Sequence, residues 1–120
     1  PLIGVGYGSW KIKSIDYDKE NIISYIIPYT MHNDFLEVAV ELGLIGFILF
    51  ILFFLLPLIH LYNLFRKFQS PFYITLASSL IVYLIDSNIN FPFIRISNIF
   101  YIALVISIIY SLKINPNENS

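Results

Sequence analysis

One histidine and three polar residues close behind it form the part of this sequence best suited to chemistry. His32, Asn33, Asp34 and Glu37 lie in the segment HNDFLEVAVELGLIG, directly before a long uncharged run. A neutral imidazole can act as a general base, because it accepts a proton near pH 7. A histidine beside a helix start is more often structural, so the residue types alone leave both roles open.

A short amphipathic helix, at about residues 34–42, is expected to position this histidine. Asn33 or Asp34 can serve as its N-cap, and the spacing of Asp34 and Glu37 matches a capping box. Gly43 suits the position just after the helix. The helix start favours neutral imidazole whereas nearby acids favour imidazolium, so the protonation state of the histidine stays open.

Metal binding is a weaker alternative for the same segment. His32, Asp34, Glu37 and Glu41 carry atoms that could bind a metal ion, but they lack the two-histidine helix spacing of zinc proteases. The three acids share one helix face, where capping and solvation explain them equally well. We therefore expect no metal at this site.

The composition is typical of a membrane protein. Hydrophobic residues make up 58% of the chain and charged residues only 12%, against about 25% charged in soluble domains. A net charge of −1 gives no indication of nucleic-acid binding. Cysteine is absent, which excludes disulfides, thiolate metal sites and cysteine nucleophiles. No signal peptide is recognised, and we expect the C-terminal part of a longer membrane protein.

Three apolar runs are predicted to cross the membrane, at about 44–62, 72–89 and 96–112. The first would measure about 28 Å at about 1.5 Å per residue, close to the hydrocarbon thickness of a bilayer. We therefore predict an all-α membrane protein. Residues 1–43 are expected to form an extracytoplasmic loop that contains the short helix, and residues 113–120 a polar cytoplasmic tail.

The basic residues predict how these spans are oriented. Arg66 and Lys67 follow the first span and Lys113 follows the third, which by the positive-inside rule makes that side cytoplasmic. Residues 1–43 and the turn DSNINFPFIR would then face the opposite side. Arg95 is the arginine of that turn, and it is either a ligand-binding residue or an interfacial anchor.

The glycine-rich opening, PLIGVGYGSW, is expected to serve packing. It lacks the strand and helix that flank the glycines of a dinucleotide-binding fold. Close backbone approach explains its glycines better than phosphate binding.

Taken together, these segments resemble the O-antigen ligases and the related Wzy-type polymerases. His32-Asn33, nine residues and then Gly43-Leu44-Ile45-Gly46 fill every specified position of the family motif H-[N/S/Q]-x9-G-x-x-[G/T/Y]. PLIGVGYGSW is similar to the glycine-rich stretch that opens the family's large periplasmic loop segment. NINFPFIR is similar to its F-x-F-P-x-x-R turn. The resemblance runs over roughly residues 2–112.

The resemblance implies part of a larger GT-C-type helical bundle in the bacterial inner membrane, with residues 1–43 periplasmic. The implied activity moves a glycan from undecaprenyl diphosphate to a sugar hydroxyl, on lipid A–core or a similar acceptor. A polymerase would instead join lipid-linked repeat units. Neither activity implies a nucleotide sugar at this face, a metal, another cofactor or a nucleic-acid partner.

The resemblance also implies roles for single residues. His32 would be the catalytic base, and Arg95 would bind the diphosphate, because a guanidinium matches phosphate oxygens bidentately. The supporting residues would be Asn33, Asp34, Glu37, Gly43 and Gly46.

Two other classes of function stay open. A transporter or channel fragment could use Asp86, His60 and His32 as a proton path. A non-catalytic membrane scaffold could use the acidic helix to dock a partner.

Overall fold

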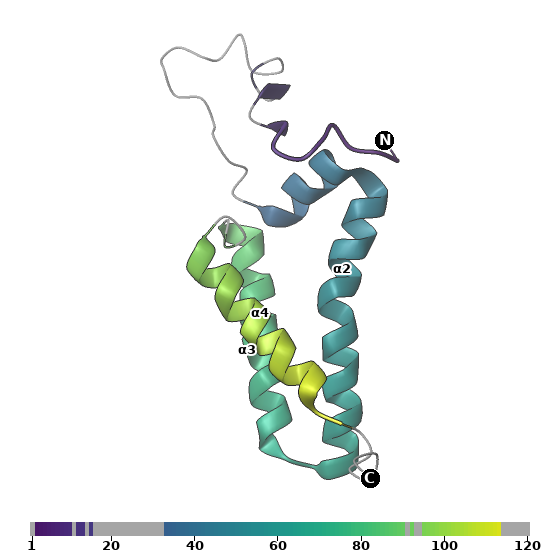
Figure 1. The fold of residues 1–120 in the computed structure, drawn as a ribbon, viewed down its shortest axis with the longest axis vertical. Helices are drawn as coiled ribbons and strands as arrows, with labels where there is room; N and C mark the ends of the chain where they lie inside the picture. The colour runs from purple at the N-terminus through teal and green to yellow at the C-terminus, as the bar shows by residue number, and fades with distance from the viewer. Residues whose placement is uncertain are drawn as a thin grey trace.

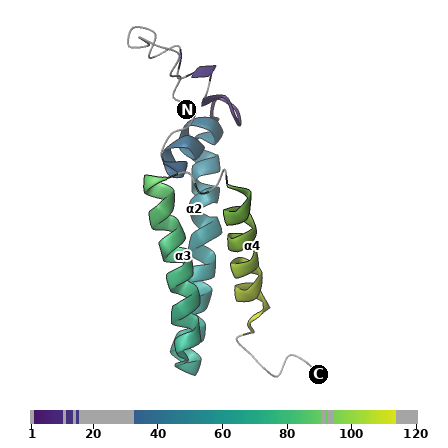
Figure 2. The ribbon, with the colours of Figure 1, turned by 90° about the vertical axis from the view of Figure 1, so that its left-hand side faces the viewer.

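The computed structural model describes residues 2–10, 12, 13, 15, 33–90, 92 and 95–113. Three long helices, α2 (Asp34–Phe68), α3 (Pro71–Ile89) and α4 (Ile96–Ser111), make up most of this part of the chain. The described residues contain no β-strand. The three helices pack along one another in a narrow bundle (Figure 1, Figure 2). The prediction of an all-α fold is therefore confirmed for these residues.

Helix α2 consists of two helical segments that meet at Gly43. The backbone of Gly43 has φ 69° and ψ −167°, which interrupts the helical geometry. Figure 1 shows the short first segment lying across the end of the long second segment. The long segment continues to Phe68, beyond the apolar run at 44–62.

Asn33 is the N-cap of α2, and its side-chain oxygen accepts a hydrogen bond from the Leu36 amide. Asp34 is therefore the first helical residue, and the capping box expected between Asp34 and Glu37 is wrong by one position. An asparagine with extended backbone, here φ −164°, satisfies an amide that the first turn leaves unbonded. Asp34 and Glu37 still stabilise the start of α2, because carboxylates interact favourably with the positive end of the helix dipole.

The core follows one stripe along each helix. On α2 and α3 the buried positions recur at alternating spacings of four and three residues, and on α4 they fall at i, i+3, i+4 and i+7. Both patterns place the buried side chains on one face of each helix. The stripes are Phe50, Phe54, Pro57, Leu61 and Leu64 on α2, Leu76, Leu80, Tyr83 and Ser87 on α3, and Ile102, Val105, Ile106 and Ile109 on α4.

Two of the described helices, α2 and α3, are long and apolar enough to cross a membrane. Helix α4 is also apolar but has only 16 residues. Its predicted span at 96–112 is therefore at the short end of what crosses a bilayer, about 17–25 residues. Hydroxyl groups on the α3 surface bond their own backbone, as Ser78 does with Ile74 and Ser79 with Thr75. Such bonds let serine lie in an apolar environment without an exposed donor.

The bundle has two distinct ends (Figure 1). At one end lie residues 2–10, the start of α2 and the turn from α3 to α4. At the other end lie the connection from α2 to α3, which follows Arg66 and Lys67, and the end of α4. At this second end, His60 connects α2 to the residue that follows α4, through a 2.9 Å contact between its Nε2 and the Leu112 carbonyl oxygen.

Candidate functional site

The predicted base, His32, lies outside the described residues, and its neighbour Asn33 gives the geometry of this point in the chain. The Asn33 side chain makes two hydrogen bonds in different directions. Its Oδ1 accepts from the Leu36 amide at 3.0 Å, and its Nδ2 donates to the Asn88 carbonyl at 3.2 Å. One side chain therefore caps α2 and joins it to the last turn of α3.

The last turn of α3 is itself tied down by side chains. Asn88 donates to the Leu84 carbonyl at 2.8 Å, and Asn90 donates to the Asp86 carboxylate at 2.6 Å. Asp86 thus has a local structural partner at this end of the bundle. These contacts give the polar side chains of Asp86, Asn88 and Asn90 a structural role in the last turn of α3.

Acidic residues of the short α2 segment line a cavity of about 310 Å³. Asp34 and Glu41 are almost fully buried, at 3% and 4% exposed. The cavity wall continues onto the long segment of α2 with apolar side chains, including Leu49, Phe50 and Phe53. The corner in α2 thus creates a hollow lined by three acidic side chains and by apolar side chains from both segments.

The corner depends on glycine for two separate reasons. Gly43 has a positive φ that side-chain-bearing residues rarely adopt. A Cβ at Gly43 would also come 2.5 Å from the Gly4 nitrogen and 2.7 Å from the Leu2 carbonyl oxygen. A Cβ at Gly46 would collide with the Leu42 side chain. The corner at Gly43 and Gly46 is therefore tightly packed.

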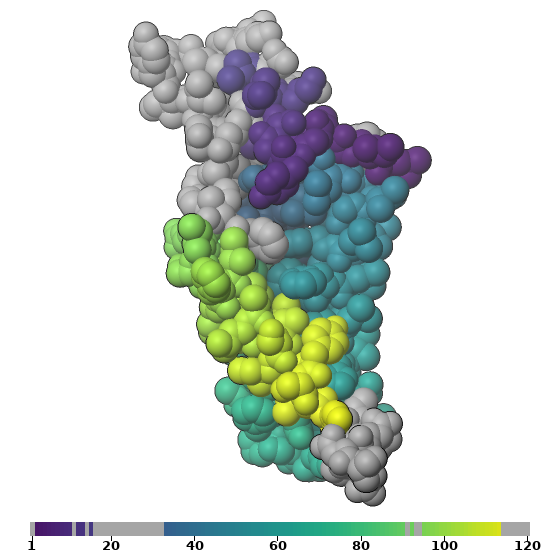
Figure 3. Space-filling view, in the orientation of Figure 1, coloured from purple at the N-terminus to yellow at the C-terminus, as the bar shows by residue number. Residues whose placement is uncertain are grey.

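Residues 2–10 complete this junction by covering the end of the short segment. The amides of Val5 and Gly6 donate to the carbonyls of Val40 and Glu41, at 3.1 and 2.9 Å. These carbonyls belong to the last turn before the corner, where α-helical donors run out. Figure 3 shows residues 2–10 lying against the start of α2. The expected close packing of the glycine-rich stretch holds at Gly4, where an added Cβ would overlap the backbone of Glu41.

Arg95 lies at the same end of the bundle, as the N-cap residue of α4. Its carbonyl accepts from the amides of Asn98 and Ile99, and its side chain makes no capping bond. The residue is exposed. The structure therefore brings the start of α2 and the α3–α4 turn together at one end.

Among the described residues, no group of three or more histidine, cysteine, aspartate or glutamate side chains could hold a metal ion. The alternative ligand set of His32, Asp34, Glu37 and Glu41 includes a histidine outside this part of the chain.

His60, which the transporter interpretation places on a proton path with Asp86, belongs to the opposite end of the bundle. It contacts the Leu112 carbonyl and stacks on Tyr110, with ring centroids 6.0 Å apart. These contacts give it a structural role in holding the end of α4 against α2.

Comparison with known families covers the corner and the segments on both sides of it. Residues 1–51 match the family model described as O-antigen ligase. This part of the chain is O-antigen ligase-like. The match includes all four specified motif positions, His32, Asn33, Gly43 and Gly46. No curated protein and no solved structure matches the chain. The resemblance to the O-antigen ligases is therefore confirmed over residues 1–51.

The O-antigen ligase segment and the apolar helices together support a membrane protein. Within the described residues, the segment comprises the glycine-rich stretch, the short part of α2, the corner and the first turns of the long part. The family motif thus coincides with the junction that shapes this end of the bundle.

Sequence reasoning missed two residues of this site. Glu41 was interpreted as part of a solvated acidic stripe, yet it is buried and bonded to the glycine-rich stretch. Tyr7 was not singled out, yet it lines the cavity. No local signal marks Glu41 in the sequence, because the two amides that its carboxylate binds belong to Gly8 and Trp10, far away along the chain.

Proposed function

We propose that this chain carries the acceptor-activating part of a membrane glycosyltransferase that moves a glycan from undecaprenyl diphosphate to a sugar hydroxyl. The observation that carries the proposal is the O-antigen ligase match over residues 1–51, which includes His32 and the Gly43–Gly46 corner. The reaction would take place at the periplasmic face of the inner membrane. Lipid A–core or a similar glycan is the proposed acceptor.

In the proposed reaction, His32 removes the proton from the acceptor hydroxyl as its oxygen attacks the anomeric carbon of the donor. A new carbon–oxygen bond forms, and the bond from the anomeric carbon to the diphosphate oxygen breaks. The electron pair leaves with undecaprenyl diphosphate. The configuration at the anomeric carbon inverts, because the acceptor oxygen attacks the face opposite the leaving group. His32 later releases its proton to solvent.

Two features of the described residues support a site at this end. Asn33, which follows His32 in the sequence, donates a hydrogen bond to the Asn88 carbonyl of α3. Arg95 is the N-cap residue of α4 at the same end of the bundle. We assign Arg95 to the diphosphate, where a guanidinium would stabilise the charge that develops on the leaving group.

The same family segment also fits a Wzy-type polymerase, whose acceptor is a second lipid-linked repeat unit. The two activities share the base, the donor and the leaving group. They differ in the lipid-linked species that builds up when the enzyme fails, so one experiment separates them.

The test replaces His32 with alanine in the intact protein, expressed in its host without the native copy. Surface glycan and lipid-linked intermediates are then analysed together. We expect loss of finished glycan. Accumulation of long lipid-linked polymer identifies a ligase, and accumulation of single lipid-linked repeats identifies a polymerase.

His60→Gln is the matched control, because it removes the chain's other histidine while keeping a donor for the Leu112 carbonyl. This variant should make glycan at the wild-type level. An unchanged glycan profile in His32→Ala, at normal protein amount, would show that the histidine is a helix-start residue and that the proposed mechanism is wrong.

A further inference from the structure

Glu41 fixes the glycine-rich stretch through its carboxylate as well as its backbone. Its Oε2 accepts from the Gly8 amide at 2.8 Å, and its Oε1 accepts from the Trp10 amide at 3.0 Å. Burial of the Glu41 side chain strengthens these bonds, because a hydrogen bond is electrostatically stronger inside a protein than in water. We call these two bonds the Glu41 latch.

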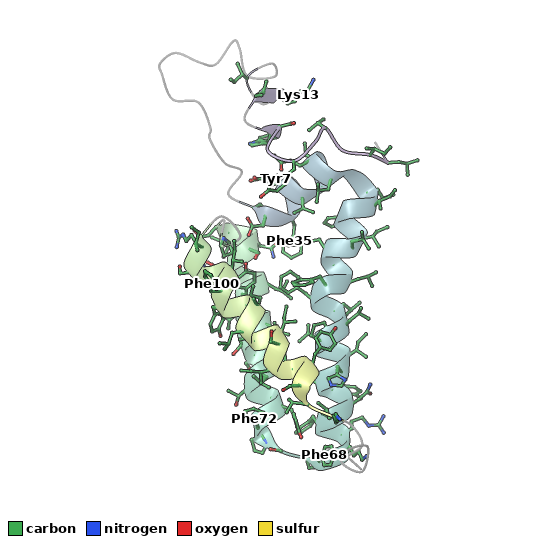
Figure 4. All side chains as sticks on the ribbon, in the orientation of Figure 1. Tyr7, Lys13, Phe35, Phe68, Phe72 and Phe100 are labelled. Carbon is green, nitrogen blue, oxygen red and sulfur yellow. The ribbon has the colours of Figure 1, made fainter. Side chains whose placement is uncertain are left out.

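The latch holds the backbone on either side of one exposed aromatic ring. Tyr7 lies between Gly6, whose amide bonds the Glu41 carbonyl, and Gly8, whose amide bonds the Glu41 carboxylate. Its side chain is 86% exposed although both neighbours are anchored. Figure 4 shows Tyr7 beside the first turns of α2. A ring on a fixed backbone loses little conformational freedom when it binds something.

The ring borders the cavity formed at the α2 corner. Tyr7 lines that cavity together with Asp34, Glu37 and Glu41, and apolar side chains of α2 complete the lining. A volume of about 310 Å³ is at the small end of ligand pockets, which span about 300–1,000 Å³. Aromatic rings pack on the C–H faces of sugars, and cavities with a few polar groups hold their hydroxyls.

We propose that Tyr7 contacts a sugar ring of the substrate glycan and that Glu41 is the positioning residue that holds Tyr7 at the cavity. This inference rests on the proposed function and adds a substrate contact to it. The sugar belongs to either the donor or the acceptor glycan, and the chemistry of the contact is the same for both.

The first test measures binding, so that it does not depend on turnover. The probe is the oligosaccharide released from the host's own lipid-linked glycan, titrated into intact protein that carries His32→Ala. Tyr7→Ala should weaken binding about tenfold, as expected for loss of an aromatic anchor. Tyr7→Phe should bind as the parent does, because the ring remains. Tyr101→Ala, which removes an exposed tyrosine of α4, is the matched control and should have no effect.

The second test asks whether Glu41 acts through Tyr7. Glu41→Ala should weaken oligosaccharide binding to the same extent as Tyr7→Ala, and the double variant should be no weaker than either single one. Glu41→Gln keeps one acceptor oxygen and should restore part of the affinity. Losses that multiply in the double variant would overturn the positioning role, because they would show independent effects.

Turnover measurements with otherwise native protein then assign the sugar. Tyr7→Ala should raise KM about tenfold for one substrate and leave kcat within about twofold. A raised KM for the lipid-linked glycan means that Tyr7 contacts the donor. A raised KM for the acceptor means that Tyr7 contacts the acceptor. Unchanged binding and unchanged KM in Tyr7→Ala overturn the proposal. Because His32→Ala tests transfer by itself, its loss of glycan together with a silent Tyr7→Ala would reject only the tyrosine contact.

Discussion

At the scale of single residues, the most constrained position is Gly43. Its φ of 69° with ψ of −167° lies in a region that glycine alone occupies comfortably. The Gly4 nitrogen and the Leu2 carbonyl fill the space where a side chain would begin. The first glycine of the family motif is thus required both by its own backbone and by the chain packed against it.

Gly43→Ala should therefore destabilise the protein by about 2–5 kcal/mol, combining backbone strain and overpacking. Thermal unfolding of purified protein in detergent measures the loss. Gly8→Ala is a matched control, because Gly8 has φ +75° but no atom within 4 Å of its added Cβ. It should lose only about 1–2 kcal/mol. Equal losses in the two variants would mean that contact with residues 2–4 contributes nothing.

At the scale of elements, the side chain of Asn33 links α2 to α3. It uses an acceptor for its own helix and a donor for the neighbouring helix. Because the two hydrogen bonds use different atoms of Asn33, substitutions can remove one and keep the other. This link matters for the proposed chemistry because His32 directly precedes Asn33 in the sequence.

Asn33→Asp keeps an acceptor for the Leu36 amide but removes the donor to the Asn88 carbonyl. Hydrogen exchange should then quicken in the last turn of α3 while the Leu36 amide stays protected. Asn33→Ala should quicken both, with a loss of about 1 kcal/mol from the missing cap. Mass spectrometry of overlapping peptides measures the hydrogen-exchange rates of α2 and α3 separately. Wild-type exchange at the end of α3 in Asn33→Asp would show that the bond to Asn88 does not hold the helices together.

At the scale of the whole molecule, the question is whether α4 crosses the membrane. The structure places the α2–α3 connection and the end of α4 at one end, opposite residues 2–10. Three spans in this arrangement would put the basic residues Arg66, Lys67 and Lys113 on one side, as the positive-inside rule favours.

Single cysteines test this arrangement cleanly, because the chain contains no native cysteine. A membrane-impermeant maleimide applied to intact cells should label Ile12→Cys and Ser97→Cys but not Gln69→Cys or Lys113→Cys. Permeabilised cells supply the control, since all four positions are exposed in the structure and should then react. Labelling of both Ser97→Cys and Lys113→Cys in intact cells would mean that α4 does not cross.

The sequence by itself determined the helical class, the approximate apolar runs and the resemblance to the O-antigen ligases over residues 1–51, because each depends on local composition or on residues at fixed spacing. The 3.6-residue repeat and the absence of charge are enough to indicate apolar helices. The histidine and glycine motif needed only counting along the chain.

Only the tertiary structure decided what the polar residues near the corner do. The sequence leaves Asn33 and Asp34 as alternative caps and gives no sign of the bond from Asn33 to the Asn88 carbonyl, which joins positions far apart in sequence. Glu41 looks like any residue of an acidic face until the chain of residues 2–10 folds back onto it. The physical reason is that hydrogen bonds between distant segments depend on how helices pack, and no local pattern encodes which amide meets which carboxylate.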